Sequence, residues 1–123
     1  MKFTNSEEQV MKYLWKLKRA FFKDLMNEFP DPKPATTTLN TLIKRIIDKG
    51  GVDFKVYGNS REYYALIEKD QYFSGHVKSL IKDFFNDSSG QFASFFTKQI
   101  DMSDEELKEL RDLVDDQLSK KNE

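Results

Sequence analysis

The chain has 123 residues and no cysteine, and its 20 Lys and Arg nearly balance its 21 Asp and Glu. This length favours one domain, or one small domain with an accessory element. The absence of cysteine excludes disulfides, thiolate metal sites and cysteine nucleophiles. No apolar run approaches the length of a membrane span, and the start lacks the apolar core of a signal peptide. We therefore expect a cytoplasmic protein with no membrane insertion.

Charge is distributed unevenly along the chain. Residues 1–66 hold 12 Lys and Arg against 8 Asp and Glu, a net +4, whereas residues 67–123 hold 8 against 13, a net −5. This asymmetry predicts a basic N-terminal domain at residues 1–67 and an acidic, accessory region at residues 68–123. A net +4 over this length is also common in ordinary domains, so charge alone does not indicate nucleic-acid binding.

The first predicted element is an amphipathic helix. Thr4 and Glu7 stand three residues apart before an apolar series, which is the spacing of a capping box. Trp15 is interpreted as a core residue rather than a binding aromatic, because aromatic side chains dominate small cores. The cations Lys18 and Arg19 suit the end of this helix. Its buried side would consist of Val10, Met11, Tyr13, Leu14 and Leu17.

A short second helix is predicted from about Phe21 to Phe29, although no Ser, Thr or Asp stands at its start to cap it. Three prolines between residues 30 and 34 then forbid helix and stiffen the connection. The last of them, Pro34, can stand in the first turn of a following helix, where its missing N–H costs nothing.

A third helix is predicted to run to about Lys49, with Gly50 and Gly51 as its exit, and it is the segment most informative about function. Its apolar stripe would consist of Leu39, Leu42, Ile43, Ile46 and Ile47. Short polar and basic side chains lie on or beside the other face: Thr36, Thr37, Thr38, Asn40, Thr41, Lys44 and Arg45. Such hydroxyls and amides hydrogen-bond base edges in the major groove, and threonine methyl groups pack on thymine. The pattern predicts the recognition helix of a winged helix-turn-helix.

Two strands are predicted next, Val52 to Tyr57 and Arg61 to Leu66, around a Gly58-Asn59-Ser60 turn. They would form a β-wing with a basic tip. Arg61 would reach a phosphate or a minor groove, and Lys49 and Lys55 would join Lys44 and Arg45 in holding the DNA backbone. Each of these cations is equally compatible with an ordinary surface charge.

Residues 68–123 predict three short helices with apolar residues at helical spacing. Asp87-Ser88-Ser89-Gly90 breaks the first from the second, and Ser103 with Glu106 forms a capping box before the third. Helices this short and apolar can hardly bury themselves on each other, so we predict a dimer interface; packing on the N-terminal domain is the alternative. The candidate interface residues are Phe73, Val77, Leu80, Ile81, Phe84, Phe85, Phe92, Phe95, Phe96, Leu107, Leu110 and Val114.

No arrangement for catalysis is recognisable. His76 is the only histidine, and a metal site needs several converging ligands. The chain lacks a phosphate-binding loop and a Gly-x-Ser-x-Gly elbow. The acidic residues between 104 and 116 are interpreted as a solvated helix face. We therefore predict a protein that is not an enzyme, with no metal and no cofactor.

Several short motifs occur in one order along the chain: Val10-Met11 with Leu14-Trp15, Thr38-x-x-Thr41-Leu42, Lys49-Gly50 and Tyr63-Tyr64-Ala65-Leu66. This series resembles the penicillinase and methicillin-resistance repressor family over nearly the whole chain. The resemblance implies a homodimeric winged helix that represses β-lactamase or resistance genes. Its third helix would read double-stranded operator DNA, a pseudo-palindrome with TACA/TGTA half-sites. By the same resemblance Thr38, Thr41, Arg45 and the wing from Lys55 to Tyr63 would contact that DNA.

The resemblance also implies a route of derepression, in which a membrane sensor metallopeptidase leads to cutting of the tail at an Asn-Phe pair. The equivalent pair here is Phe95-Phe96, so the asparagine of the family's cut site is absent. Either the peptidase partner has another specificity or another signal is used. A copper-sensing branch of the family uses a C-terminal cysteine cluster, which the cysteine-free chain excludes.

The sequence thus predicts a mainly α fold with a small antiparallel β-wing: a winged helix-turn-helix DNA-binding domain plus a C-terminal helical dimerisation region. The predicted function is a homodimeric, sequence-specific transcriptional repressor. Two alternatives stay open. One is a winged-helix module that docks a protein partner without specific DNA binding. The other is a winged helix that responds to a small molecule held among the phenylalanines of the tail.

Overall fold

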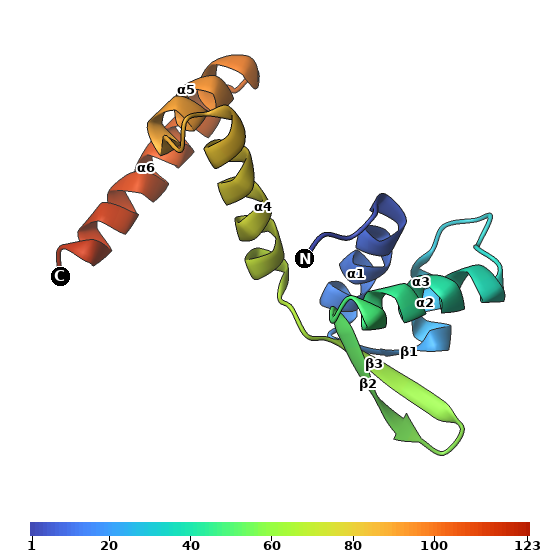
Figure 1. The fold of residues 1–123 in the computed structure, drawn as a ribbon. Helices are drawn as coiled ribbons and strands as arrows, with labels where there is room; N and C mark the ends of the chain where they lie inside the picture. Colours follow the sequence, from blue (N-terminus) through green and yellow to red (C-terminus); the bar gives the residue numbers. More distant parts are fainter. The chain divides into compact units, whose positions relative to one another are not determined.

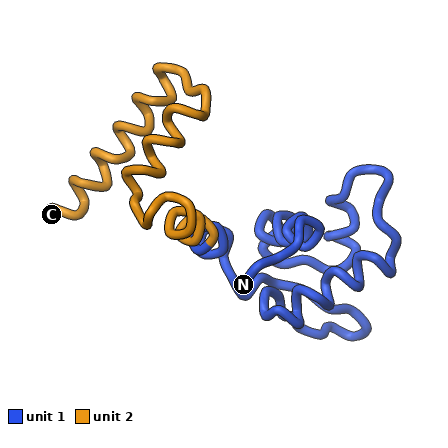
Figure 2. The backbone as a smooth tube through the Cα atoms, turned by 45° about the horizontal axis from the view of Figure 1, so that its top comes forward, with its two compact units in different colours: residues 1–75 blue, residues 76–123 orange.

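The computed structural model describes all of residues 1–123 and has two compact units, residues 1–75 and residues 76–123 (Figure 2). It is mainly helical with a three-stranded antiparallel sheet, which confirms the predicted fold class. Figure 1 shows the elements, in chain order α1 (Asn5–Leu17), β1 (Arg19–Phe21), α2 (Phe22–Glu28), α3 (Thr36–Asp48), β2 (Val52–Tyr57), β3 (Ser60–Ala65), α4 (Lys69–Phe84), α5 (Ser89–Gln99) and α6 (Asp104–Lys121).

Helix α1 begins with the predicted capping box. The Glu7 N–H donates to Thr4 Oγ1 at 3.2 Å, and the Thr4 N–H donates to Glu7 Oε1 at 2.9 Å. Two of the N–H groups that every helix start leaves without partners are satisfied in this way. At the other end Lys18 turns the chain with a φ of 72°, a left-handed conformation that directs it into the next element.

That next element is a strand, β1. The sequence had placed Arg19 at the end of the first helix and Phe21 at the start of the second, whereas both residues belong to this strand. Its register pairs Arg19 with Tyr64 and Phe21 with Glu62, so that β3 lies between β1 and β2. Helix α2 begins at Phe22, one residue after the predicted start, because Phe21 is still extended. No side chain precedes α2 as a cap; instead the Phe21 N–H donates to Asp24 Oδ2 at 2.9 Å.

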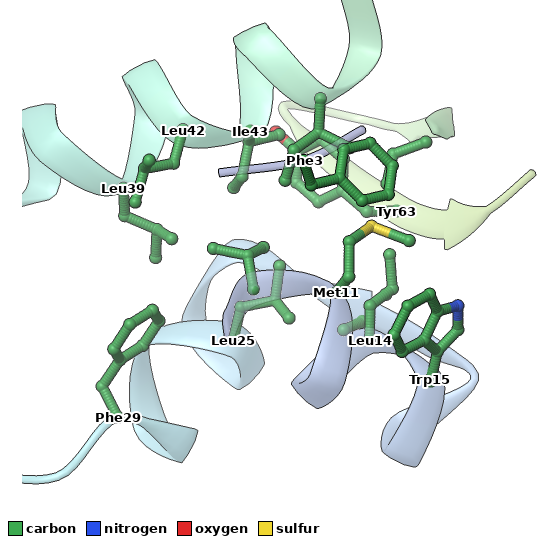
Figure 3. Packing of buried hydrophobic residues seen from close by; sticks show 14 of the residues in the cluster. Phe3, Met11, Leu14, Trp15, Leu25, Phe29, Leu39, Leu42, Ile43 and Tyr63 are labelled. Atoms are coloured by element: carbon green, nitrogen blue, oxygen red, sulfur yellow. The ribbon is translucent and has the colours of Figure 1, made fainter. Parts of the chain in front are cut away.

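The core of the first unit lies between the three N-terminal helices and the sheet (Figure 3). Trp15 belongs to it, as predicted, with 8% of its surface exposed, and its indole N–H donates to the Ile67 carbonyl at 2.9 Å. The apolar stripe of α3 is buried at Leu39, Leu42, Ile43 and Ile46. Burial of one face of α3 fixes its polar face toward solvent.

Strands β2 and β3 form the predicted wing. Gly58 has a φ of 60° and is the first of two residues between the paired Tyr57 and Ser60, which is the position that glycine takes in a type II′ turn. At the base of the wing, Gly51 lies against the core so closely that an added Cβ would come within 2.5 Å of the Phe3 ring. Only glycine fits at this junction between α3 and the wing.

The first turn of α4 is built into the N-terminal unit through Tyr72, which is 2% exposed. Its ring stacks on Phe3 at 4.9 Å between centroids. Its hydroxyl accepts the Phe3 N–H at 3.1 Å and donates to Glu8 Oε2 at 2.6 Å. Burial, together with the Glu8 hydrogen bond, raises the pKa of this hydroxyl. The compact unit therefore runs to Gly75, inside α4, whereas the functional division at residue 67 stays a prediction.

The second unit has no buried core of its own: neither α5 nor α6 contains a buried residue. Its best-packed part is a group of phenylalanines. Phe85 lies 5.5 Å from Phe92 and 5.1 Å from Phe95, and Phe92 lies 6.1 Å from Phe96, between ring centroids. None of the chain's helices combines the length and the apolar character needed to cross a bilayer.

Candidate nucleic-acid interface

Helix α3 presents its polar face to solvent. All seven candidate residues on it are exposed: Thr36, Thr37, Thr38, Asn40, Thr41, Lys44 and Arg45. Five residues, four of them from this set, line a shallow groove of about 260 Å³: Thr37, Thr38, Thr41, Leu42 and Arg45. The face therefore offers hydroxyls, an amide and two cations with no carboxylate among them, which is the chemistry needed to contact bases and phosphates.

Thr41 has one of its hydrogen-bonding functions already in use. Its hydroxyl donates to the Thr37 carbonyl, one turn back, at 2.9 Å. The oxygen lone pairs and the methyl group remain available, so Thr41 can accept a hydrogen bond from a base amino group or pack on a thymine methyl group.

The wing holds Arg61 in a defined place. The register pairs Val56 with Arg61 and Phe54 with Tyr63, so that Arg61 shares a face of the ribbon with Phe54. The guanidinium carbon lies 4.3 Å from the centroid of the Phe54 ring. A cation over a ring face is held by the ring quadrupole, and its N–H groups stay free at the edge.

Lys55 lies on the other face of the ribbon, directly across from Glu62. Glu62 also faces Arg19 of β1, with 3.6 Å between charged atoms. The two wing cations that the sequence singled out therefore do not converge on one point. The DNA contacts of Lys55 and Arg61 remain predictions.

Lys49, predicted to hold the DNA backbone, also has a structural role in the first unit. Its ammonium group pairs with the Glu7 carboxylate and donates to the Lys2 carbonyl at 3.2 Å. Glu7 is 1% exposed. Burial would raise the pKa of Glu7, but the hydrogen bonds from Lys49 and Thr4 hold it below its usual value. The sequence did not predict this pair, because Glu7 lies 42 positions away and packing alone brings it to the end of α3. Contact of Lys49 with the DNA backbone stays a prediction.

The fold also brings together residues that no local sequence pattern connects. A depression of about 490 Å³ lies where α2, α3 and the wing meet. It is lined by Phe21, Phe22, Lys23, Thr36, Asn40, Asn59, Ser60, Arg61 and Tyr63. Thr36, Asn40 and Arg61 were candidates already, and Asn59 and Ser60 lie in the wing that the family resemblance implied. Lys23 was not a candidate, because no spacing rule connects the start of α2 to the tip of a hairpin.

The candidate dimer residues of the tail are all at least partly accessible. Those with the larger exposed fractions are Phe73, Val77, Leu80, Phe84, Phe95, Leu107 and Val114. The half-buried ones are Ile81, Phe85, Phe92, Phe96 and Leu110. The candidate cleavage pair Phe95-Phe96 lies inside α5, in the aromatic group.

Comparison with known proteins agrees with this geometry. The family described as penicillinase repressor matches residues 3–116. The methicillin resistance regulatory protein MecI of Staphylococcus aureus (strain N315) is 27% identical over 112 residues, which cover 90% of this chain and 91% of the relative. The penicillinase repressor of Bacillus licheniformis is 23% identical over 121 residues, which cover 98% and 94% of the two chains. This family consists of transcriptional repressors that bind operator DNA and are not enzymes. The chain belongs to the penicillinase repressor family.

Proposed function

We propose that this chain represses transcription as a homodimer bound to a pseudo-palindromic operator. The observation that carries the proposal is the exposed face of α3 with its threonine, asparagine, lysine and arginine side chains, flanked by a wing that holds Arg61 over Phe54. Each protomer places α3 in the major groove of one half-site and the wing on the adjoining backbone. The regulated genes are those of a β-lactam-resistance or related operon, a proposal supported by the names of the relatives.

The second half of the proposal concerns the tail. Helices α4, α5 and α6 expose apolar residues that a second copy would cover, including Phe84 at 76% and Val114 at 59% exposure. Joining two half-site readers raises the effective concentration of the second reader, so the dimer binds far more tightly than one chain. Such a protein acts where its DNA is, in the cytoplasm.

Release of the operator would then require only that the dimer contact made by the tail is lost. Cleavage or disruption of residues 68–123 would separate the two readers without changing α3. A membrane sensor metallopeptidase is the proposed partner. Because Phe95-Phe96 lies within α5, cutting there would require local unfolding of that helix first. Cleavage at this pair is therefore expected to be slow in the intact dimer and faster once the tail opens.

The test is a titration of the protein onto the DNA upstream of its own gene, with a scrambled duplex as the control, at two salt concentrations. We expect tight, salt-sensitive binding to the upstream duplex, with two chains per site, and much weaker binding to the scrambled one. Equal and weak binding to both duplexes would contradict the proposal and favour a winged helix that docks a protein partner.

A further inference from the structure

We propose that the depression between α2, α3 and the wing seats one sugar–phosphate segment of the operator backbone, with Lys23 and Arg61 as the groups that meet the phosphate. The inference rests on the proposed DNA-binding function and assigns a binding role to the start of α2. The depression has a volume of about 490 Å³, enough for a backbone segment rather than for a single ion.

The polar lining of this depression has one chemical character. Two cations, two amides and two hydroxyls line it, and no carboxylate does: Lys23, Arg61, Asn40, Asn59, Thr36 and Ser60. The carboxylates nearest in sequence are engaged elsewhere. Asp24 accepts the Phe21 N–H at 2.9 Å, and Glu62 faces Arg19 at 3.6 Å. No internal anion among the lining residues therefore competes for the two cations, which suits an external phosphate.

Local stability does not explain a lysine at position 23. Lys23 is exposed in the first turn of α2, where a positive charge opposes the helix dipole. Its only neighbouring counter-charge in the turn, Asp24, already accepts a backbone N–H. A phosphate in the depression would give the Lys23 ammonium group a partner of opposite charge.

Phe54 acts as a positioning residue for Arg61. The ring lies 4.3 Å below the guanidinium carbon, so one face of the guanidinium is covered and its N–H groups are directed sideways. Three rings line the depression itself, Phe21, Phe22 and Tyr63. Deoxyribose is the less polar part of the backbone and can lie against these rings while its phosphate meets the cations.

The experiment measures how operator affinity depends on salt for the full-length protein and for the variants Lys23→Gln and Arg61→Gln. Each variant should lower the slope of log affinity against log salt by about one unit. Affinity for the operator and for a scrambled duplex should fall by similar factors, because a backbone contact carries no sequence information. Lys12→Gln is the matched control, since Lys12 is exposed on α1 and lines a different depression; its slope should equal that of the parent.

A second experiment tests whether a phosphate of the operator binds in the depression. A set of operator duplexes is used, each with one phosphate replaced by a neutral methylphosphonate. At one position per half-site, this replacement should lower the affinity of the parent protein for the duplex but leave the affinity of Arg61→Gln unchanged. Phe54→Leu should also lower the operator affinity of the parent protein. In the Arg61→Gln background the same substitution should cause little further loss of affinity, because the ring acts through Arg61.

Unchanged salt slopes for Lys23→Gln and Arg61→Gln would overturn the inference, as would an equal loss in Lys12→Gln. Failure of the repressor proposal looks different. The parent protein could bind both duplexes equally while the two variants still lower the slope of log affinity against log salt. That result would support the backbone contact of Lys23 and Arg61 and contradict specific operator recognition. Competition by inorganic phosphate at millimolar concentration would indicate a free-anion site and would overturn the assignment to DNA backbone.

Discussion

The two compact units of this protein differ in how they bury apolar surface. In residues 1–75 the core is complete within one chain, from Phe3 to Tyr72, and even a carboxylate, that of Glu7, is buried and paired with the more exposed Lys49. In residues 76–123 helices as apolar as α5 have no buried residue. The first unit can therefore be stable alone, whereas the second needs another surface to cover it. Under the proposed function, this difference would allow opening of the tail alone to weaken DNA binding.

The largest expected effect is in the core of the first unit. Ile46→Ala removes a fully buried side chain from α3 and should lower the free energy of unfolding by about 3 kcal/mol in urea titrations. Leu66→Ala is the matched control, because Leu66 is 55% exposed and its truncation should cost less than about 0.5 kcal/mol. Similar losses in the two variants would mean that the first unit is not packed as described.

The tail should respond in the opposite way, with little loss of fold and a large loss of binding. Val114→Asp places a charge on an exposed apolar position of α6, so it leaves the core of the first unit intact. If it separates the protomers, operator affinity should fall by about 100-fold, the lower end of what linking two sites provides.

Ser119→Asp adds the same charge to the other side of α6 and should bind operator like the parent. Gel-shift titrations compare the three proteins. Parental affinity in Val114→Asp would show that the tail does not join the two readers through this face.

The ion pair between the buried Glu7 carboxylate and Lys49 predicts a pH dependence specific to the first unit. Glu7→Gln should lower the free energy of unfolding by about 2 kcal/mol at neutral pH, because a charged hydrogen bond to Lys49 is lost. The pKa of Glu7 is held below its usual 4.5 in the folded state. Its contribution is therefore complete above about pH 4.5 and lost as the pH falls through the folded pKa.

The difference between Glu7→Gln and the parent should accordingly shrink in acid, as measured by urea unfolding between pH 7 and pH 3. Glu28→Gln breaks the more exposed pair with Lys16 and should cost less than about 1 kcal/mol. A difference for Glu7→Gln that stays constant across this pH range would rule out the depressed pKa.

Features set by residues close together in the sequence were predicted, whereas features set by contacts between distant residues were not. The capping box at Thr4, the stripe of α3 and the Gly58 turn are local patterns, and the structure confirmed all three. Strand β1 was missed because three residues carry no periodicity and its pairing with Tyr64 is long-range. The role of Lys49 was missed for the same reason.

The candidate interface shows the same division. The exposed face of α3 followed from helical spacing, because burial of one face determines the other. The depression that adds Lys23 to Arg61 depends on how α2 packs beside the hairpin, which no local pattern encodes. The anchoring of α4 by Tyr72 likewise depends on contacts with Phe3 and Glu8 at the other end of the unit.

The smallest predicted effect tests base recognition by α3. Thr41→Ala removes an acceptor and a methyl group and should lower discrimination between operator and scrambled DNA by about 1 kcal/mol. Thr97→Ala in α5 is the matched control, because its hydroxyl donates to a carbonyl one turn back, at 2.8 Å, just as that of Thr41 does. Competition titrations with the two duplexes measure the ratio. An equal ratio in Thr41→Ala and the parent would exclude Thr41 from sequence readout.

The most direct test of the proposal that a second copy covers the tail is sedimentation equilibrium of the full-length protein and of Val114→Asp, both at micromolar concentration. A single chain has a mass of 14.5 kDa. We expect the parent to sediment at twice that mass, and the variant at the mass of one chain with the fold of its first unit intact by circular dichroism. A parent protein that sediments as one chain would contradict the proposal that a second copy covers the tail.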